Sequence, residues 1–263
     1  MHWVIGDIHG MLRPLRALVE RVRKHDPGAT LLFVGDYVNR GPDSKGVLDF
    51  LISLDNARFG RGNHDDVFDL LLHGRGFVEN PSAPNEVAAF RWFIQHGLWE
   101  TMVSYGVEPW DVDQTFVRAS PESVARVMSA VPEAHRAFIR NLEPVMEFET
   151  FFVAHAMWAA DESDTPPILP RVIAEPRLRY QVLWGRYGRE LTRPKPWKRT
   201  GFFGHTPVQT YPADLQGVEN TPIRGPSIVL LDTACALTPE GRLSAVCAET
   251  GETIQVDRLG GAV

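Results

Sequence analysis

The sequence predicts a mixed α/β fold in which parallel strands begin a sheet and the second half is rich in strands. Short apolar runs alternate with segments of helical spacing through the first 73 residues. From residue 145 onward, short apolar runs recur with turn residues between them. The alternating strand–helix order of the first part is typical of strands that pair in parallel within one sheet.

Helical spacing is clearest at two places in this first part. Leu15, Leu18 and Val22 repeat on one helix face, and Val47 and Leu51 do the same after Pro42-Asp43. In chain order, the predicted elements are a strand at 2–5, a helix at 11–25, a strand at 31–34, a helix after Pro42, a short strand at Phe59 and a helix at 65–73.

The character of the sequence changes between about residue 74 and residue 142, where helical periodicity dominates. Prolines mark breaks or helix starts in this region. We expect a helical insertion over one edge of the core rather than a separate domain, so that residues 1–263 form a single domain. The predicted helices cover 85–98, 121–130 and 132–142.

The second half is expected to begin with a hairpin at 145–154, in which VMEFE and TFFVA are the two strands. Residues 161–200 are rich in proline, arginine and aspartate and are expected to be largely loop. Strands follow at 227–232 and 242–246, with residues 239–241 as the turn between them. The TIQV segment near the C-terminus is expected to add another strand.

Composition excludes several classes of protein. A chain of 263 residues, 44% of them hydrophobic, can bury a sizeable core. Its net charge of −6 gives no basic field for a nucleic acid duplex. No apolar run reaches the roughly 18 residues of a membrane span, and the N-terminus lacks the pattern of a signal peptide. We therefore expect a cytoplasmic protein in which Cys235 and Cys247 are buried, reduced thiols, with a disulfide between them as the alternative.

Five short motifs carry polar residues at predicted strand ends. An apolar run that leads into glycine and a polar side chain is typical of a buried strand that ends in a loop, and open α/β sheets bind their ligands at such ends. Only GNHD lacks the apolar run, since it follows ARFGRG. In chain order, the motifs are GDIHG with Asp7 and His9, GDYVNRG with Asp36, Asn39 and Arg40, GNHD with Asn63 and His64, VAHA with His155, and GHT with His205.

The residue types in these motifs are ligands of hard or borderline divalent cations, because they combine carboxylate, imidazole and amide groups without a thiolate. Asp7 and His9 are two residues apart and can point the same way from an extended loop. Asp36 supplies a second carboxylate, which can bridge two cations. A water between two such cations loses a proton near neutral pH and becomes a nucleophile. Asn63, together with the histidines of the last two motifs, can complete the second cation site.

Two arginines are candidates for binding phosphate. Arg40 lies four residues after Asp36, and Arg186 lies in LWGRYGRE. A guanidinium group can bind two phosphate oxygens at once. Arg179, Arg189 and Arg193 are nearby alternatives to Arg186.

Each motif alone also has a purely structural explanation. A single Gly-Asp pair is commonly a turn, and a single His155 or His205 is more often a core histidine with satisfied hydrogen bonds. The five motifs together, in this order, are far more specific for a metal site. The remaining histidines lack such a context and are expected to be surface or structural residues: His2, His25, His73, His96 and His135.

The set GDIHG, GDYVNRG, GNHD, HA and GHT, which spans residues 6 to 206, resembles the calcineurin-like metallophosphoesterases. Within them it looks like the phosphoprotein phosphatase family, on its bacterial and phage branch. The resemblance implies a four-layer α/β/β/α sandwich with a dinuclear metal site at the strand ends. It implies that Asp7, His9 and Asp36 hold the first metal ion, and that Asp36, Asn63, His155 and His205 hold the second.

The same resemblance implies roles in catalysis. His64 is expected to be the general acid that protonates the leaving group, supported by Asn39. Arg40, Arg186 and Asn63 are expected to contact the phosphoryl group. The two divalent cations are expected to be Mn²⁺, with Fe, Zn and Mg as alternatives.

Three positions depart from the protein-phosphatase pattern. Asn39 stands where an aspartate usually supports the acid histidine, and it is expected to orient the His64 ring through its amide oxygen. Asp65 replaces the glutamate of GNHE, as in the diadenosine tetraphosphatases of this family, and is an alternative support for His64. Met157 and Ala234 stand where glycines often follow HA and DT, which predicts local loop differences near the metals.

Three functions follow as hypotheses. The leading one is a metal-dependent serine/threonine protein phosphatase with a phosphoprotein substrate, for which phosphotyrosine is a further candidate. The alternative is hydrolysis of a nucleoside polyphosphate such as diadenosine tetraphosphate, favoured by GNHD and by Asn39. Trp92, Phe93 and Trp99 can stack on a base, although packing within the insertion explains them more simply. The third hypothesis, a non-catalytic phosphate-binding module, is disfavoured because every metal ligand is present.

Overall fold

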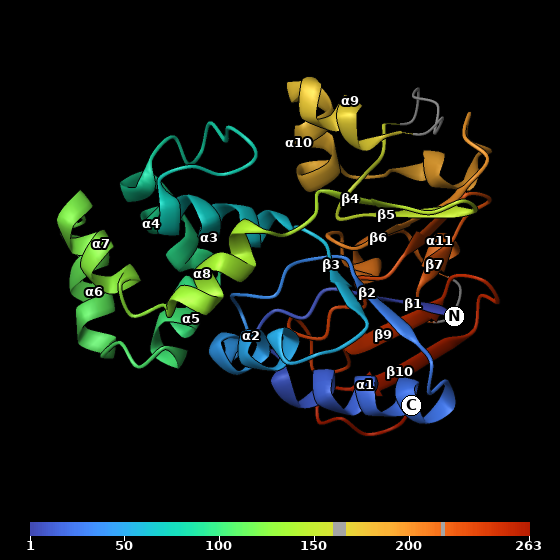
Figure 1. Ribbon diagram of the computed structural model, residues 1–263, viewed down its shortest axis with the longest axis horizontal. Helices are drawn as coiled ribbons and strands as arrows, with labels where there is room; N and C mark the ends of the chain where they lie inside the picture. The colour runs from blue at the N-terminus through green and yellow to red at the C-terminus, as the bar shows by residue number, and fades with distance from the viewer. Residues whose placement is uncertain (160–166, 217–218) are drawn as a thin grey trace.

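Two five-stranded sheets form the centre of the molecule, and helices cover their outer faces (Figure 1). The computed structural model describes residues 1–159, 167–216 and 219–263. The first sheet has the order β10-β9-β1-β2-β3 and the second has the order β4-β5-β6-β8-β7. The four layers confirm the predicted α/β/β/α architecture.

The first sheet joins the two ends of the chain. β1, β2 and β3 pair in parallel, as their strand–helix order predicted. β9 is antiparallel to β1 and to β10, so the last strands extend the sheet on the other side of β1. The strands are β1 (His2–Ile5), β2 (Thr30–Phe33), β3 (Ala57–Phe59), β9 (Arg242–Cys247) and β10 (Thr253–Asp257).

The second sheet is mixed. The predicted hairpin is present as antiparallel β4 and β5, while β5, β6 and β8 run parallel and β7 is antiparallel to β8. The strands are β4 (Val145–Glu147), β5 (Phe151–Ala154), β6 (Thr200–Phe203), β7 (Ile223–Arg224) and β8 (Ile228–Leu230).

The turn predicted between 227–232 and 242–246 does not form a hairpin. β8 belongs to the second sheet and β9 to the first, so the segment between them carries the chain from one sheet to the other. Ala234 in this crossing has a left-handed φ of 61°. Local turn residues are the same for a hairpin and for a crossing, and only the pairing distinguishes them.

Side-chain alternation explains why the sheets pack face to face. Val4 and Leu32 point between the sheets, where they meet Val153 and Phe202. Their neighbours Trp3, Ile5, Leu31 and Phe33 point the other way, against the outer helices. Strands that are apolar on both faces are buried on both faces, which is the condition for a sandwich with outer helices.

Helices α1 (Leu12–His25) and α2 (Ser44–Ile52) cover the outer face of the first sheet. α9 (Leu169–Ala174) and α10 (Pro176–Trp184) cover the second sheet. The prediction that 161–200 is largely loop is therefore wrong for these two helices; residues 160–166 lie outside the described part. Two of the prolines that suggested a loop, Pro170 and Pro176, occupy the first turns of α9 and α10, where a missing N–H costs nothing. Short helical turns follow at Arg189–Thr192, Val208–Thr210 and Ala213–Gln216.

The predicted helical insertion lies beside the sandwich (Figure 1). Its apolar residues belong to the same buried cluster as the outer face of the first sheet; its place within a single domain stays a prediction. After α3 (Asn63–His73), its elements are α4 (Glu86–Phe93), the irregular turn η1 (Ile94–Leu98), α5 (Trp99–Ser104), α6 (Pro109–Val117), α7 (Pro121–Met128) and α8 (Glu133–Arg140).

The helix predicted over 85–98 is interrupted at its end. His96 and Gly97 leave helical geometry, and Gly97 has a φ of 94°. A Cβ on Gly97 would collide with the backbone nitrogen of Arg40. The break therefore brings the insertion into direct contact with the loop that carries Arg40.

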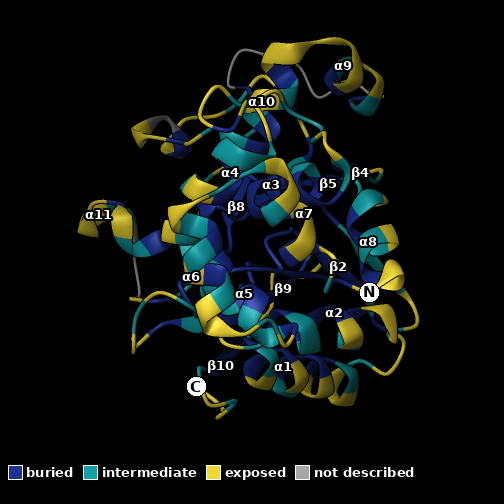
Figure 2. Cartoon of the chain, turned by 90° about the vertical axis from the view of Figure 1, so that its left-hand side faces the viewer, coloured by how far each residue is buried: buried dark blue, intermediate teal, exposed yellow. Residues whose placement is uncertain are grey.

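Buried residues lie in the strands and on the inward sides of the helices, and exposed residues lie mainly on the outward sides of the helices (Figure 2). Both cysteines, Cys235 and Cys247, are buried free thiols, as predicted. None of the helices in the described ranges is long and apolar enough to cross a membrane.

A buried arginine fixes the start of α3 against α8. Arg61 is 4% exposed, and its guanidinium donates to Asp66 (3.1 Å) and Asp69 (2.9 Å). It also donates to the carbonyl oxygens of Ile139 (3.1 Å) and Arg140 (2.9 Å). This one side chain therefore satisfies acceptors on two helices.

Arg61→Ala is expected to lower the free energy of unfolding by about 3–5 kcal/mol, because it removes the arginine that pairs with the buried Asp66 and the closer of the two arginines that pair with the buried Asp69. Lys45→Ala removes the exposed pair with Asp49 and is expected to cost less than about 1 kcal/mol. Urea unfolding followed by circular dichroism measures both values. Equal losses for the two variants would contradict the structural role of Arg61.

Candidate active site

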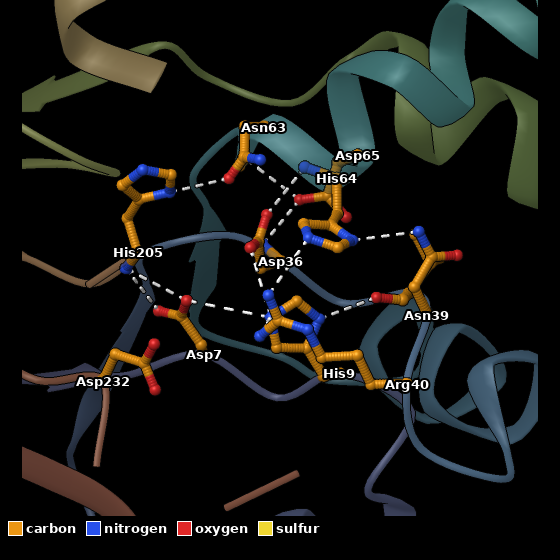
Figure 3. Close-up of polar contacts among 12 residues, drawn as sticks. Asp7, His9, Asp36, Asn39, Arg40, Asn63, His64, Asp65, His205 and Asp232 are labelled. Carbon is orange, nitrogen blue, oxygen red and sulfur yellow. Dashed lines mark hydrogen bonds and ion pairs between the residues drawn. The ribbon is translucent and has the colours of Figure 1, made fainter. Parts of the chain in front are cut away.

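The residues of all five motifs meet at one place, at the carboxyl ends of strands from both sheets (Figure 3). Asp7 and His9 follow β1, and Asp36 follows β2. His155 follows β5 and His205 follows β6. Asn63 and His64 begin α3. Packing the two sheets face to face brings these strand ends together, although up to 198 residues separate the partners along the chain.

The loops that carry these residues have unusual backbone conformations. His9, Asp36 and His205 have left-handed φ values of 47°, 58° and 66°. A Cβ on Gly35 would collide with the backbone of Gly62, and one on Gly62 would collide with Asp36. The glycines of two motifs therefore allow two loops to touch, and the strained residues are those that point into the site.

Two buried groups of potential ligands share the carboxylate of Asp36. His9, Asp36 and His64 form one triad, and Asp36, His155 and His205 form the other. The ligand atoms of each triad lie within 4.8 Å of one another. His9 Nε2 is 3.3 Å from one oxygen of Asp36, and His155 Nε2 is 3.5 Å from the other.

Hydrogen bonds to the backbone orient two of the imidazole rings. Nδ1 of His9 donates to the carbonyl of Val38 (2.9 Å), and Nδ1 of His155 donates to that of Val34 (3.2 Å). Each ring then presents the lone pair of Nε2 toward Asp36. This is the tautomer that a metal ion requires.

Asn63 joins the second triad. Its side-chain oxygen lies 2.9 Å from Nε2 of His155 and 2.8 Å from Nδ1 of His205. Nε2 of His205 is buried and has no hydrogen-bond partner among the described residues. Oxygen and nitrogen lone pairs that converge in a buried space are the donor set of a divalent cation, so the residues fit two metal ions that share Asp36.

Buried carboxylates perturb one another here. Burial, with the nearby charges of Asp232 and Asp36, raises the pKa of Asp7 well above its usual value. Burial alone would also raise the pKa of Asp36, but the neighbouring His155, His64 and His9 outweigh it and hold that pKa well below the usual value. Asp36 is therefore the carboxylate that stays ionised.

The carboxylate of the predicted ligand Asp7 lies farther from His9 than the carboxylate of Asp36 does. One oxygen of Asp7 is 4.0 Å from Nε2 of His9, while both oxygens accept from the backbone N–H of His205 (3.2 and 3.0 Å). Asp7 thus links the loop after β1 to the loop after β6 across the two sheets.

Asp232, in the DT pair before Ala234, lies at the site but was not among the predicted site residues. It follows β8 and is buried; one oxygen accepts from the N–H of Ala234 (3.0 Å), and the other has no partner in the described ranges. The signal that can identify it is the run SIVLLD, an apolar strand followed by a carboxylate, which is the pattern of the other motifs. Ala234 keeps the left-handed conformation typical of a glycine at this position.

Arg40 directs its guanidinium into the site. One nitrogen donates to Nε2 of His9 (2.6 Å), and the other contacts Nε2 of His64 (3.3 Å). A cationic group therefore already faces the lone pair of His9.

His64 is held by Asn39, but not in the way that the sequence suggested. The amide nitrogen of Asn39, rather than its oxygen, lies 2.9 Å from Nδ1 of His64. The amide oxygen instead accepts from the hydroxyl of the buried Thr101 (3.0 Å). The amide N–H of Asn39 can therefore only donate to Nδ1. Burial, above all, holds the pKa of His64 well below its usual value.

Asp65 does not contact His64. Its carboxylate accepts from the backbone N–H groups of Asp36 (2.7 Å), Tyr37 (2.9 Å) and Gly62 (3.0 Å). Burial and the nearby Asp36 charge raise its pKa to about 7. Asp65 holds the loop of the shared carboxylate in place.

Arg186 lies at the edge of the site. It is exposed and donates to the hydroxyl of Thr206 (3.2 Å), next to His205. Both residues line a cavity of about 450 Å³. Arg189 instead pairs with Asp214 (2.9 Å) on the surface.

Comparisons with known proteins agree with this geometry. Residues 2–169 match the family described as Calcineurin-like phosphoesterase. A protein of Coxiella burnetii (strain RSA 493 / Nine Mile phase I), named "Bis(5'-nucleosyl)-tetraphosphatase, symmetrical", is 31% identical over 159 residues, which cover 53% of this chain and 52% of the relative. The protein of the same name from Marinomonas sp. (strain MWYL1) is 43% identical over 86 residues, 32% of this chain and 31% of the relative. The chain thus matches about half the length, or less, of these curated relatives.

Solved structures share the fold. A putative diadenosine tetraphosphatase has a TM-score of 0.56 at 20% identity, over 97% of this chain and 92% of the other. A protein serine/threonine phosphatase from Saccharomyces cerevisiae has a TM-score of 0.50 at 15% identity, over 97% and 79% of the two chains. Because the family match covers well over half of the 263 residues and includes four of the five motifs, the chain belongs to the calcineurin-like phosphoesterases.

Proposed function

We propose that this protein is a metal-dependent hydrolase that cleaves phosphoanhydride bonds of nucleoside polyphosphates. The observation that carries the proposal is the hydrogen bond from the amide of Asn39 to Nδ1 of His64. The relatives named as bis(5'-nucleosyl)-tetraphosphatases support the same class of substrate.

Asp7, His9 and Asp36 are proposed to hold one cation, and Asp36, Asn63, His155 and His205 the other. Two divalent cations held there supply a water of lowered pKa and Lewis-acid polarisation of the phosphoryl group. The donor set suits Mn²⁺, with Fe, Zn and Mg as alternatives. The backbone bonds of His9 and His155 keep both rings oriented before a cation or substrate binds.

The chain's polar groups favour a leaving group that needs no proton. A serine or threonine alkoxide must be protonated as it departs, and a histidine does this best as imidazolium. An imidazolium needs a hydrogen-bond acceptor at Nδ1, but Nδ1 of His64 faces the N–H donor of Asn39. A phosphate leaving group departs as a stable anion, so an anhydride tolerates this arrangement.

Two arginines are proposed to bind phosphate oxygens. Arg40 lies between His9 and His64, close to the reacting group. Arg186 and Thr206 lie on the side of His205 and line a cavity that has room for more of the phosphate chain. Charge-assisted hydrogen bonds from both sides would neutralise a polyphosphate along its length.

A panel of substrates tests the proposed class. With Mn²⁺ and separately with Mg²⁺, kcat/KM is measured for diadenosine tetraphosphate, p-nitrophenyl phosphate, and phosphoserine, phosphothreonine and phosphotyrosine peptides. We expect diadenosine tetraphosphate to exceed the phosphoserine peptide by at least about 100-fold, the lower end of what general acid catalysis contributes. A preference for the phosphoserine or phosphothreonine peptide would instead identify a protein phosphatase.

Asp36→Asn is expected to reduce turnover by about 100-fold or more and to lower the bound metal below two ions per chain, because a neutral amide bridges cations poorly. Asp55→Asn, at an exposed loop position, is the matched control and should leave both quantities unchanged. Metal content is measured by elemental analysis of the purified proteins. Normal metal content with near wild-type turnover in Asp36→Asn would exclude a shared bridging carboxylate.

Asn39→Asp is expected to raise turnover of a phosphoserine peptide about 10-fold more than turnover of p-nitrophenyl phosphate, since a carboxylate accepts from Nδ1 and lets His64 act as an acid. Asn39→Leu, which neither donates nor accepts, is the control and should not show this selectivity. Equal effects of Asn39→Asp on the two substrates would show that position 39 does not govern protonation of the leaving group.

A further inference from the structure

Three aromatic side chains form a stack between two layers of helices that border the site. The rings of Trp92 on α4 and Trp184 on α10 are nearly parallel, with centroids 5.7 Å apart and planes inclined by 24°. Tyr180, one turn earlier on α10, stacks on Trp184 at 6.4 Å and 21°. We call Tyr180, Trp184 and Trp92 the aromatic stack.

The aromatic stack approaches both metal triads. Its middle ring, Trp184, meets the ring of His205 edge to face, with centroids 6.3 Å apart. Its end ring, Trp92, lies 5.2 Å from the ring of His96 and 5.1 Å from that of Phe93, and Phe93, which is outside the stack, lies 5.0 Å from His64. A molecule whose phosphate is held at the two triads therefore has an aromatic surface beside it.

Packing explains other aromatics of the insertion, whereas Trp92 and Trp184 pack against the core and still keep part of their surface exposed. Phe93 is 1% exposed and belongs to the core, and Trp99 donates its indole N–H to Asp113 (3.0 Å). Trp92 and Trp184 are partly exposed, as Trp99 is, and Tyr180 is 45% exposed.

The indole nitrogen of Trp184 gives a second indication. It is buried and has no hydrogen-bond partner among the residues that the structure describes. A buried indole N–H usually finds an acceptor. A partly exposed aromatic surface with a donor that lacks an acceptor, next to a phosphate-handling site, has the features of a surface for a flat, polar ring.

We propose that the aromatic stack binds the nucleobase of a nucleotide whose phosphate is held at the two triads. This rests on the proposed function and assigns the base-binding side chains of the same site. Stacking of a base on aromatic side chains is tolerant of base identity, because every base has a π-face. We therefore expect the site to accept purine nucleotides with little discrimination between adenine and guanine.

Binding of AMP and of ribose 5-phosphate to the metal-loaded protein tests the stack directly, because the two ligands differ by the base alone. Isothermal titration calorimetry measures both dissociation constants. In the wild type, AMP is expected to bind roughly 10- to 100-fold more tightly than ribose 5-phosphate. This ratio should fall close to one in Trp184→Leu and in Trp92→Leu.

Two further variants control the experiment. Trp110→Leu removes a tryptophan of the insertion that is 70% exposed and outside the stack, and it should keep the wild-type ratio. Trp184→Phe retains an aromatic plane at a packed position and should keep an intermediate ratio, which guards against loss of folding in Trp184→Leu. A ratio near one in the wild type, or a wild-type ratio in both leucine variants, would overturn the proposal.

The test of the aromatic stack and the test of the proposed function can fail independently of each other. A protein that cleaves diadenosine tetraphosphate but binds AMP and ribose 5-phosphate equally refutes the aromatic stack alone. A protein that shows the AMP preference but cleaves only phosphopeptides refutes the proposed function, and the base-binding assignment stands.

Discussion

The carboxylate of Asp36 is the group on which the rest of the site depends. It is 1% exposed, contacts histidines of both triads and accepts the backbone N–H of His64 at 2.9 Å. A buried anion of this kind is costly unless cations or donors surround it. The left-handed backbone at Asp36, the glycines that let two loops touch and the buried Asp65 all serve to place this one group between two sheets.

Local pattern is sufficient for most strands and for most of the candidate ligands, because all of these ligands except Asn63 follow an apolar run whose end can be read from the sequence. The same rule identifies Asp232, which is not among the five motifs although the DT pair that contains it was compared with the family pattern. It failed for α9 and α10, where proline at a helix start and proline in a loop have the same local appearance. The pairing of β9 with β1 rather than β8 was also beyond local pattern, because sheet partners are chosen by tertiary packing.

Orientation was the least predictable property of the site. The sequence predicts that Asn39 lies near His64, the proposed acid. Which end of the Asn39 amide faces the ring depends on the residue that binds its other end. That residue is Thr101, 62 residues away on α5. The contact between Trp92 and Trp184 is likewise made across two helical layers. Neither feature has a local signal, since both depend on how the insertion docks.

The insertion therefore does more than cover an edge of the core. Gly97 in η1 packs against the backbone of Arg40, Thr101 sets the direction of Asn39, and Trp92 on α4 forms one side of the aromatic stack. The metal-binding residues, in contrast, come from the two sheets and the start of α3. Under the proposed function, the sandwich supplies the candidate ligands of the metal ions, and the insertion positions the groups that would distinguish one leaving group and one substrate from another. Changes in the insertion can then alter specificity while the ligands of the metal site stay the same.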